Sequence, residues 1–221
     1  MSAKQRPLEY RLGDMLRLGI ESPNGGTIGD QYNEFQETLR FKNINYAALI
    51  SILEREKYKG IKPSNDVVVV HLRVGDTIEL LDNSVDDFLN GPLISPYVYN
   101  LEYYKNILEK LPTSIKNMVF VYGNHRPQVG FEKSTEYIKK LKSFFESKDY
   151  NVTTRSNEDA DLDFVFMCNS KHFVKGGGGF GDIIADLVKI KGNNCYAHPR
   201  PSIVLPKGVH FFKGDLRSKG V

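Results

Sequence analysis

Apolar and polar residues alternate along this chain in a pattern that predicts strands and helices in turn. Residues 66–71 read Asp-Val-Val-Val-Val-His, and such a continuous β-branched run is typical of a strand buried on both faces of a parallel sheet. Further strands are predicted at 118–122, 150–153, 171–175 and 194–197. Apolar residues at three- and four-residue spacing predict helices at 46–58, 101–111, 133–147 and 180–190, and a helix or turn at 162–167.

The alternation of strands and helices predicts an α/β fold with a Rossmann-like, doubly wound and mainly parallel sheet. Ligands of such sheets bind at the carboxyl ends of the strands, so the residues directly after each predicted strand are the candidates for a site. Residues 1–33 are rich in residues typical of loops. The segment from Gly60 to Asn65 is a candidate linker between a small N-terminal part and the main domain. We therefore expect an N-terminal part over residues 1–60 and a ligand-binding domain over 61–221.

Composition narrows the class of partner. The chain carries 30 Lys and Arg against 27 Asp and Glu, which suits an anionic small ligand but forms no basic stripe of the kind that binds nucleic acid. Cys168 and Cys195 lie among apolar or small residues, which favours buried thiols and a reducing compartment over disulfides or a zinc site. The sequence shows no secretory signal and no membrane span, so we expect a soluble, cytoplasmic protein.

The first candidate site, His71-Leu-Arg-Val-Gly-Asp76, follows the buried strand. Alternation along an extended chain places His71 and Arg73 on the same side. The planar guanidinium of Arg73 stays charged and can donate two parallel hydrogen bonds to a pyrophosphate. Taken alone, the motif is explained equally well by a purely structural role. In that interpretation Arg73 and Asp76 form an ion pair and His71 is a core histidine.

The second candidate site is the glycine run in Lys175-Gly-Gly-Gly-Gly-Phe-Gly-Asp182, between a predicted strand and a predicted helix. Without Cβ atoms, an anion can approach the main-chain N–H groups at the start of the helix. The run lacks the spacing of a Walker A loop or of a G-x-G-x-x-G fingerprint, and a flexible turn is the alternative.

These two motifs resemble the α-1,2-fucosyltransferase family. Residues 71–76 are similar to its H-x-R-x-G-D motif, and Asp163 to Leu187 is similar to its downstream block, in which an acid, an apolar stretch, a Cys, a His and a strand lead into a turn and a helix. Cys195-Tyr-Ala-His-Pro199 fits the strand and proline that close the block. The resemblance covers 66–80 and 158–199, and its glycine-rich form is similar in style to glycosyltransferases of large algal viruses, which glycosylate their own capsid proteins.

The resemblance implies a GT-B-type nucleotide-binding half and a metal-independent, inverting glycosyltransferase that moves a sugar, fucose above all, from a GDP-sugar to a glycan or glycoprotein. No cofactor besides the donor is implied. Arg73 would bind the β-phosphate with support from His71. The other donor-binding residues implied are Gly75, Asp163, Gly177, Gly178, Gly179 and Phe180. The acceptor would rely on the first 60 residues or on another polypeptide.

Departures from the family pattern keep other donors open. Glycines replace the family's serines, and Asn124-His125 stands where Ser-Asp or Thr-Asp is usual. A UDP-sugar donor, or a non-catalytic nucleotide-sugar-binding module, are therefore the alternatives. Gly25 to Gln31 loosely resembles the family's G-G-L-G-N-Q loop, but an ordinary loop is the preferred interpretation.

Acidic residues and one histidine are the candidates for a general base, which must reach an acceptor hydroxyl. They are Asp76, Glu79 and His125. Asp76 leads because it lies beside Arg73, although that positive charge would weaken it as a base. Asp161-Leu-Asp163 satisfies a D-x-D pattern, but its place before an apolar run favours solvated acids at the start of a helix over a metal site.

Overall fold

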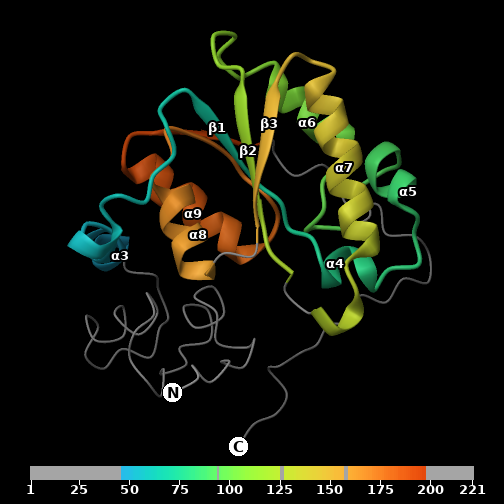
Figure 1. Cartoon of the computed structure of the whole chain (residues 1–221), viewed down its shortest axis with the longest axis horizontal. Coiled ribbons are helices and arrows are strands. Elements are labelled where there is room, and N and C mark those ends of the chain that lie inside the picture. The colour runs from blue at the N-terminus through green and yellow to red at the C-terminus, as the bar shows by residue number, and fades with distance from the viewer. Residues whose placement is uncertain (1–45, 94, 125–126, 157–158, 198–221) are drawn as a thin grey trace, which may run out of the picture.

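A computed structural model of the chain describes residues 46–93, 95–124, 127–156 and 159–197. These residues form a five-stranded parallel sheet in the order β3-β2-β1-β4-β5, between two layers of helices (Figure 1). The strands are β1 (Val67–His71), β2 (Asn117–Tyr122), β3 (Asn151–Ser156), β4 (His172–Val174) and β5 (Asn194–Tyr196). The prediction of an α/β fold with a Rossmann-like parallel sheet is confirmed.

The valine run of β1 is explained by burial on both faces of the sheet. Val68 and Val70 belong to one hydrophobic core, and Val69 belongs to the other. The first core is covered by α4 (Asp76–Glu79), α5 (Val85–Asn90), α6 (Leu101–Leu108) and α7 (Glu132–Glu146). The second core is covered by α3 (Tyr46–Leu53), α8 (Ala160–Cys168) and α9 (Gly178–Ile190), on the other side of the sheet in Figure 1.

Several element boundaries differ from the predicted ones. The helix expected over 46–58 ends at Leu53, and a 3₁₀ turn, η2 (Glu56–Tyr58), follows it. A second 3₁₀ turn, η3 (Pro127–Val129), precedes α7. The edge strand β3 runs on to Ser156, beyond its predicted end. This part was missed because the exposed positions of the strand carry polar residues, which hide the strand pattern. Two short helices, α4 and α5, were not predicted, since four and six residues are too few to show a helical period.

Helix α3 packs into the same core as the sheet. Leu49 and Ile52 are fully buried there together with Phe164 of α8 and Ile184 of α9. The boundary expected near residue 60 thus lies between two segments that share this core, and residues 1–45 of the expected N-terminal part lie outside the described residues. None of the described helices has both the length and the apolar character that a membrane span requires.

The strand order creates a switch point beside β1. From β1 the chain moves to β2 and β3 on one side, and then returns to β4 and β5 on the other side. The carboxyl ends of β1 and β4 are therefore neighbours, and Val70 is paired with Val174. Crevices for ligands form at such reversals of strand order.

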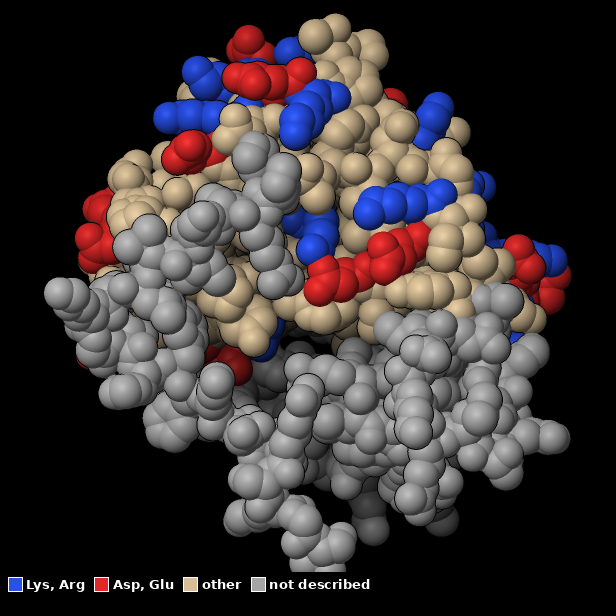
Figure 2. Space-filling model, turned by 180° about the vertical axis from the view of Figure 1, so that it is seen from behind, with Lys and Arg blue, Asp and Glu red and all other residues tan. Residues whose placement is uncertain are grey.

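On the face shown in Figure 2, Lys and Arg side chains are interspersed with Asp and Glu.

Candidate functional site

The first motif forms a rigid turn at the tip of β1. Beyond His71, the Leu72 N–H still donates to the carbonyl oxygen of Val121 in β2 at 2.9 Å. The chain then turns at Gly75, whose φ of 80° and ψ of −130° suit a residue without a Cβ, and enters α4. The Gly75 N–H donates to Ser134 Oγ of α7 at 2.9 Å. Gly75 is thus explained by its backbone conformation.

Arg73 and Asp76 form the ion pair that the structural reading expected. Arg73 Nη2 lies 3.0 Å from Asp76 Oδ1, and Nη1 donates to the carbonyl oxygen of Val74 at 3.0 Å. The two side chains are only 23% and 14% exposed, and the Asp76 Oδ1 atom itself is buried. An arginine has five N–H donors, and these two contacts leave it the capacity to bind an anion as well.

The glycine run packs tightly against the first motif. A Cβ at Gly176 would lie 2.2 Å from the carbonyl oxygen of His71, and one at Gly177 would lie 2.3 Å from that of Tyr97. A Cβ at Gly181 would lie 2.7 Å from the carbonyl oxygen of Gly176. The alternative of a flexible turn is therefore wrong, because close backbone packing requires glycine at three positions.

Helix α9 begins inside the run, two residues earlier than predicted. Its first residue is Gly178, with a φ of 84°, and its N-cap, Gly177, makes no side-chain capping hydrogen bond. The first N–H groups of a helix have no acceptor within it, and they carry the positive end of the helix dipole. The main-chain N–H groups of Gly178, Gly179 and Phe180 are therefore suited to an anion.

His71 connects the two motifs. Its side chain is only 6% exposed, and within the described ranges its Nδ1 has no hydrogen-bond partner. A Cβ at Gly176 or Gly181 would come within 2.7 Å or 3.0 Å of this nitrogen, and the Phe180 ring centroid lies 5.7 Å from that of His71. Burial, with the positive charges of Arg73 and Lys175, lowers the pKa of His71 to about 3. The imidazole is therefore neutral near pH 7, with a polar atom facing the start of α9.

His172 shows what a satisfied histidine looks like in the same sheet. It is as deeply buried as His71, but its Nδ1 lies 2.8 Å from the hydroxyl oxygen of Tyr196. Buried polar atoms in folded proteins nearly always have a partner. Of these two described histidines, His71 is therefore the candidate for binding a ligand.

Lys175 adds positive charge at the tip of β4. Its Nζ forms an ion pair with Asp182 of α9, and its carbonyl oxygen accepts a hydrogen bond from the Tyr103 hydroxyl at 2.6 Å. Lys175 was not among the predicted site residues. Its signal was present, since it lies between the strand and the glycine run.

Asp163 is buried, so the expectation of a solvated acid is wrong for it. It lies in the first turn of α8, where its Oδ1 is 2.7 Å from Nε of Arg155 in β3. This ion pair links the first turn of α8 to β3. Among the described residues, no group of three or more His, Cys, Asp or Glu is arranged to hold a metal ion.

The base candidates have different outcomes. Glu79 binds the N-terminus of α7, where its Oε1 accepts from the Ser134 N–H at 2.7 Å and its Oε2 from the Lys133 N–H at 3.3 Å. Such a helix-capping carboxylate has a structural role, as acids favour helix N-termini. His125 and the loop from Gly25 to Gln31 lie outside the described residues. Asp76 remains, engaged with Arg73.

Asn124 is a residue that sequence reasoning noted only as a departure from the family. It follows β2, the neighbour of β1, and its Oδ1 is buried without a hydrogen-bond partner in the described part of the chain.

The two cysteines are free thiols, with Cys168 buried and Cys195 half-buried. Burial raises the pKa of both thiols, so neither is a ready nucleophile.

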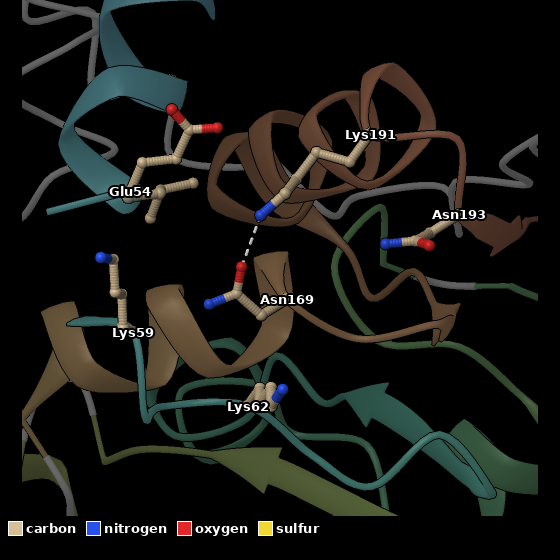
Figure 3. A pocket seen from close by; sticks show the side chains of 7 residues that line it. Glu54, Lys59, Lys62, Asn169, Lys191 and Asn193 are labelled. Atoms are coloured by element: carbon tan, nitrogen blue, oxygen red, sulfur yellow. Dashed lines mark hydrogen bonds between the residues drawn. The ribbon is translucent and has the colours of Figure 1, made fainter. Parts of the chain in front are cut away.

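A pocket of about 430 Å³ lies at the other end of the strands, where β1, β4 and β5 begin (Figure 3). It is formed where α3, α8 and α9 end, and Lys191 Nζ donates to Asn169 Oδ1 across it. Its lining residues are Leu53, Glu54, Lys59, Lys62, Asn169, Lys191 and Asn193. Lysines are favoured at helix C-termini by the helix dipole, which accounts for Lys191. The pocket is separate from both motifs.

The two motifs, which were expected to bind the same diphosphate, thus lie together at the tips of β1 and β4. Comparison with known proteins adds no relative: no protein-family model matches the chain, and no curated protein or solved structure is significantly similar to it.

Proposed function

We propose that this chain is a glycosyltransferase that takes its sugar from a nucleoside diphosphate sugar, with GDP-fucose as the preferred donor. The observation that carries the proposal is the meeting of His71 with the glycine run at the tips of adjacent strands. The family resemblance rests on the same two segments. Their contact in space supports the resemblance independently of the sequence order.

The proposed donor site uses charge and main-chain donors. The N–H groups of Gly178, Gly179 and Phe180 would donate to the diphosphate, and Arg73 would bind the β-phosphate. Negative charge grows on the leaving diphosphate during transfer, so fixed donors and a guanidinium at that point would lower the barrier. The neutral His71 would complete the site with a hydrogen bond through Nδ1. In this proposal the sheet is the nucleotide-binding half of a GT-B-type enzyme, and no metal is needed.

A non-catalytic nucleotide-sugar-binding module is the second candidate function. It is favoured by the engagement of two of the base candidates, since Asp76 pairs with Arg73 and Glu79 caps α7. Such a module would bind GDP-fucose without releasing GDP from it. An enzyme would transfer fucose to an acceptor or slowly to water.

Thermal unfolding with a panel of ligands tests both candidates. A ligand at a hundredfold excess over its Kd stabilises the fold by about 2.7 kcal/mol, which raises Tm by about 5–11 °C for a chain of this size. We expect GDP and GDP-fucose to raise Tm, with or without Mn²⁺, and UDP and UDP-sugars to have no effect. A shift with UDP alone would mean that the donor is a UDP-sugar and not GDP-fucose. No shift with any of these nucleotides would overturn the proposal.

Release of GDP from GDP-fucose then separates the enzyme from the binding module. Release above the rate without protein, lost in Arg73→Ala, supports the enzyme. Binding without any release, over a range of glycan and glycoprotein acceptors, supports the module.

A further inference from the structure

Tyr97 is an exposed aromatic residue beside the proposed donor site. It retains 40% of its exposure, whereas Tyr99, Tyr103 and Tyr104 in the same segment are buried. An exposed tyrosine alone needs no explanation. Its position is what makes it a candidate for binding.

The Tyr97 ring lies against the first residue of α9. A Cβ built on Gly178 would be 3.4 Å from Cδ1 and 3.7 Å from Cε1 of Tyr97, so only the space of a methyl group separates the ring from this glycine. The Tyr97 backbone packs so closely on Gly177 that a Cβ there would lie 2.4 Å from the Tyr97 Cα. The ring is thus held next to the N–H groups that we assign to the diphosphate.

Hydrogen bonds hold the backbone of the segment that carries Tyr97. The Tyr97 N–H donates to Ser95 Oγ at 3.2 Å. Downstream, Asn100 caps α6 by accepting from the Tyr103 N–H at 3.1 Å, and its Nδ2 donates to the carbonyl oxygen of Gly91 at 3.0 Å. Because the backbone is already held, a ligand that stacks on Tyr97 needs to order only the side chain.

We propose that Tyr97 is the stacking platform for the ring that adjoins the diphosphate of the donor. This inference rests on the proposed function. A nucleoside diphosphate sugar carries a ring on each side of its phosphates, a flat nucleobase on one side and a sugar on the other. Either presents a face to the tyrosine ring, and aromatic side chains stack on bases with a strength that corresponds to roughly a 5- to 150-fold change in affinity.

Calorimetric titration of three ligands tests the platform. They are inorganic pyrophosphate, GDP and GDP-fucose, titrated into wild type, Tyr97→Ala, Tyr97→Phe and Tyr97→Leu. We expect Tyr97→Ala to lose about 10-fold or more in GDP affinity with its pyrophosphate affinity unchanged. Tyr97→Phe keeps wild-type affinity. Tyr97→Leu keeps apolar bulk beside Gly178 but lacks the aromatic face, so it behaves like Tyr97→Ala and serves as the variant if alanine unfolds the protein.

A matched control uses an exposed apolar side chain at the far end of the same helix. Ile190 is 53% exposed at the last residue of α9, and Ile190→Ala is expected to bind all three ligands as wild type does.

The ligand whose affinity falls in Tyr97→Ala identifies the stacked ring. A loss of GDP affinity assigns the stacked ring to the base, and a loss of GDP-fucose affinity alone assigns it to the sugar. Equal losses for pyrophosphate and GDP, or no loss in either variant, would overturn the platform. A wild type that binds none of the three ligands would instead refute the proposed function.

Discussion

Gly179 is the glycine in the run whose lack of a side chain is not explained by packing or by backbone conformation. A Cβ built on Gly179 meets nothing within 4 Å, and its φ lies outside the positive range. Its neighbours differ, since Gly176 and Gly177 are needed for close packing and Gly178 has a positive φ. Alanine is a better helix former than glycine, so Gly179 carries a cost in stability that ligand binding would explain.

The substitution Gly179→Ala should therefore move stability and binding in opposite directions. In the first turn of α9 it should raise the free energy of unfolding by about 0.5–1 kcal/mol, which corresponds to a Tm higher by about 1–4 °C. Side chains of a helix lean towards its N-terminus, so the new methyl group would intrude where the diphosphate approaches. We expect GDP affinity to fall by about 10-fold, a loss of about 1.4 kcal/mol.

The assay combines thermal unfolding without ligand and calorimetric titration of GDP. Gly60→Ala is the matched control, because a Cβ there also meets nothing within 4 Å and Gly60 precedes the opposite end of β1. It should leave GDP affinity unchanged. Gly177→Ala is the contrasting variant and should destabilise the fold, because its Cβ would clash with Tyr97. Undiminished GDP binding by Gly179→Ala would refute the role of the α9 N–H groups, and a lower Tm would refute the argument from open space.

Three further predictions concern the first motif and Glu79, which follows it. Arg73→Ala should abolish transfer in a protein that still folds, with Tm lowered because the largely buried Asp76 loses this ion pair; unchanged transfer, measured as GDP release, would remove Arg73 from the mechanism. Because the pKa of His71 is lowered to about 3 in the folded state, the unfolded chain binds a proton below about pH 6.5, and stability should fall as pH drops from that value. Urea unfolding at pH 7.5 and 5.5 should show a loss in wild type larger by up to about 1.4 kcal/mol than in His71→Asn; an equal loss would contradict the buried, neutral imidazole. Glu79→Ala should lower stability by about 1 kcal/mol, as the loss of a helix cap does, with kcat unchanged; a large fall in kcat at full folding would restore Glu79 as the base.

Local patterns in the sequence were sufficient for most of the fold. The valine run predicted β1 because a central parallel strand needs apolar side chains on both faces, and the apolar positions of α7 repeat over fifteen residues. The pattern failed where an element was too short or too polar, as in α4, α5 and β3. Ser84 and Asp87 form a capping box at the start of α5, a signal that could have revealed this helix.

The candidate residues were found in the sequence because their chemistry is unusual, but their roles were not. Arg73 beside Asp76 reads equally well as a ligand site or an ion pair, and the structure contains the ion pair without using all the donors of the guanidinium. Glu79 and Asp163 looked alike as acids near a motif. One caps α7 and the other pairs with Arg155, because contacts between distant elements decide what a carboxylate does.

The sequence by itself determined most of the elements and the residue types at the strand tips, since both are encoded within a few neighbouring residues. Only the tertiary structure decided that β4 lies against β1, which brings His71 to the glycine run. A parallel strand can join either side of a sheet, and the local pattern of the strand is the same in both cases. The same limit applies to the glycines: which of them packing requires depends on the carbonyl oxygens of His71 and Tyr97, which lie far away in the sequence.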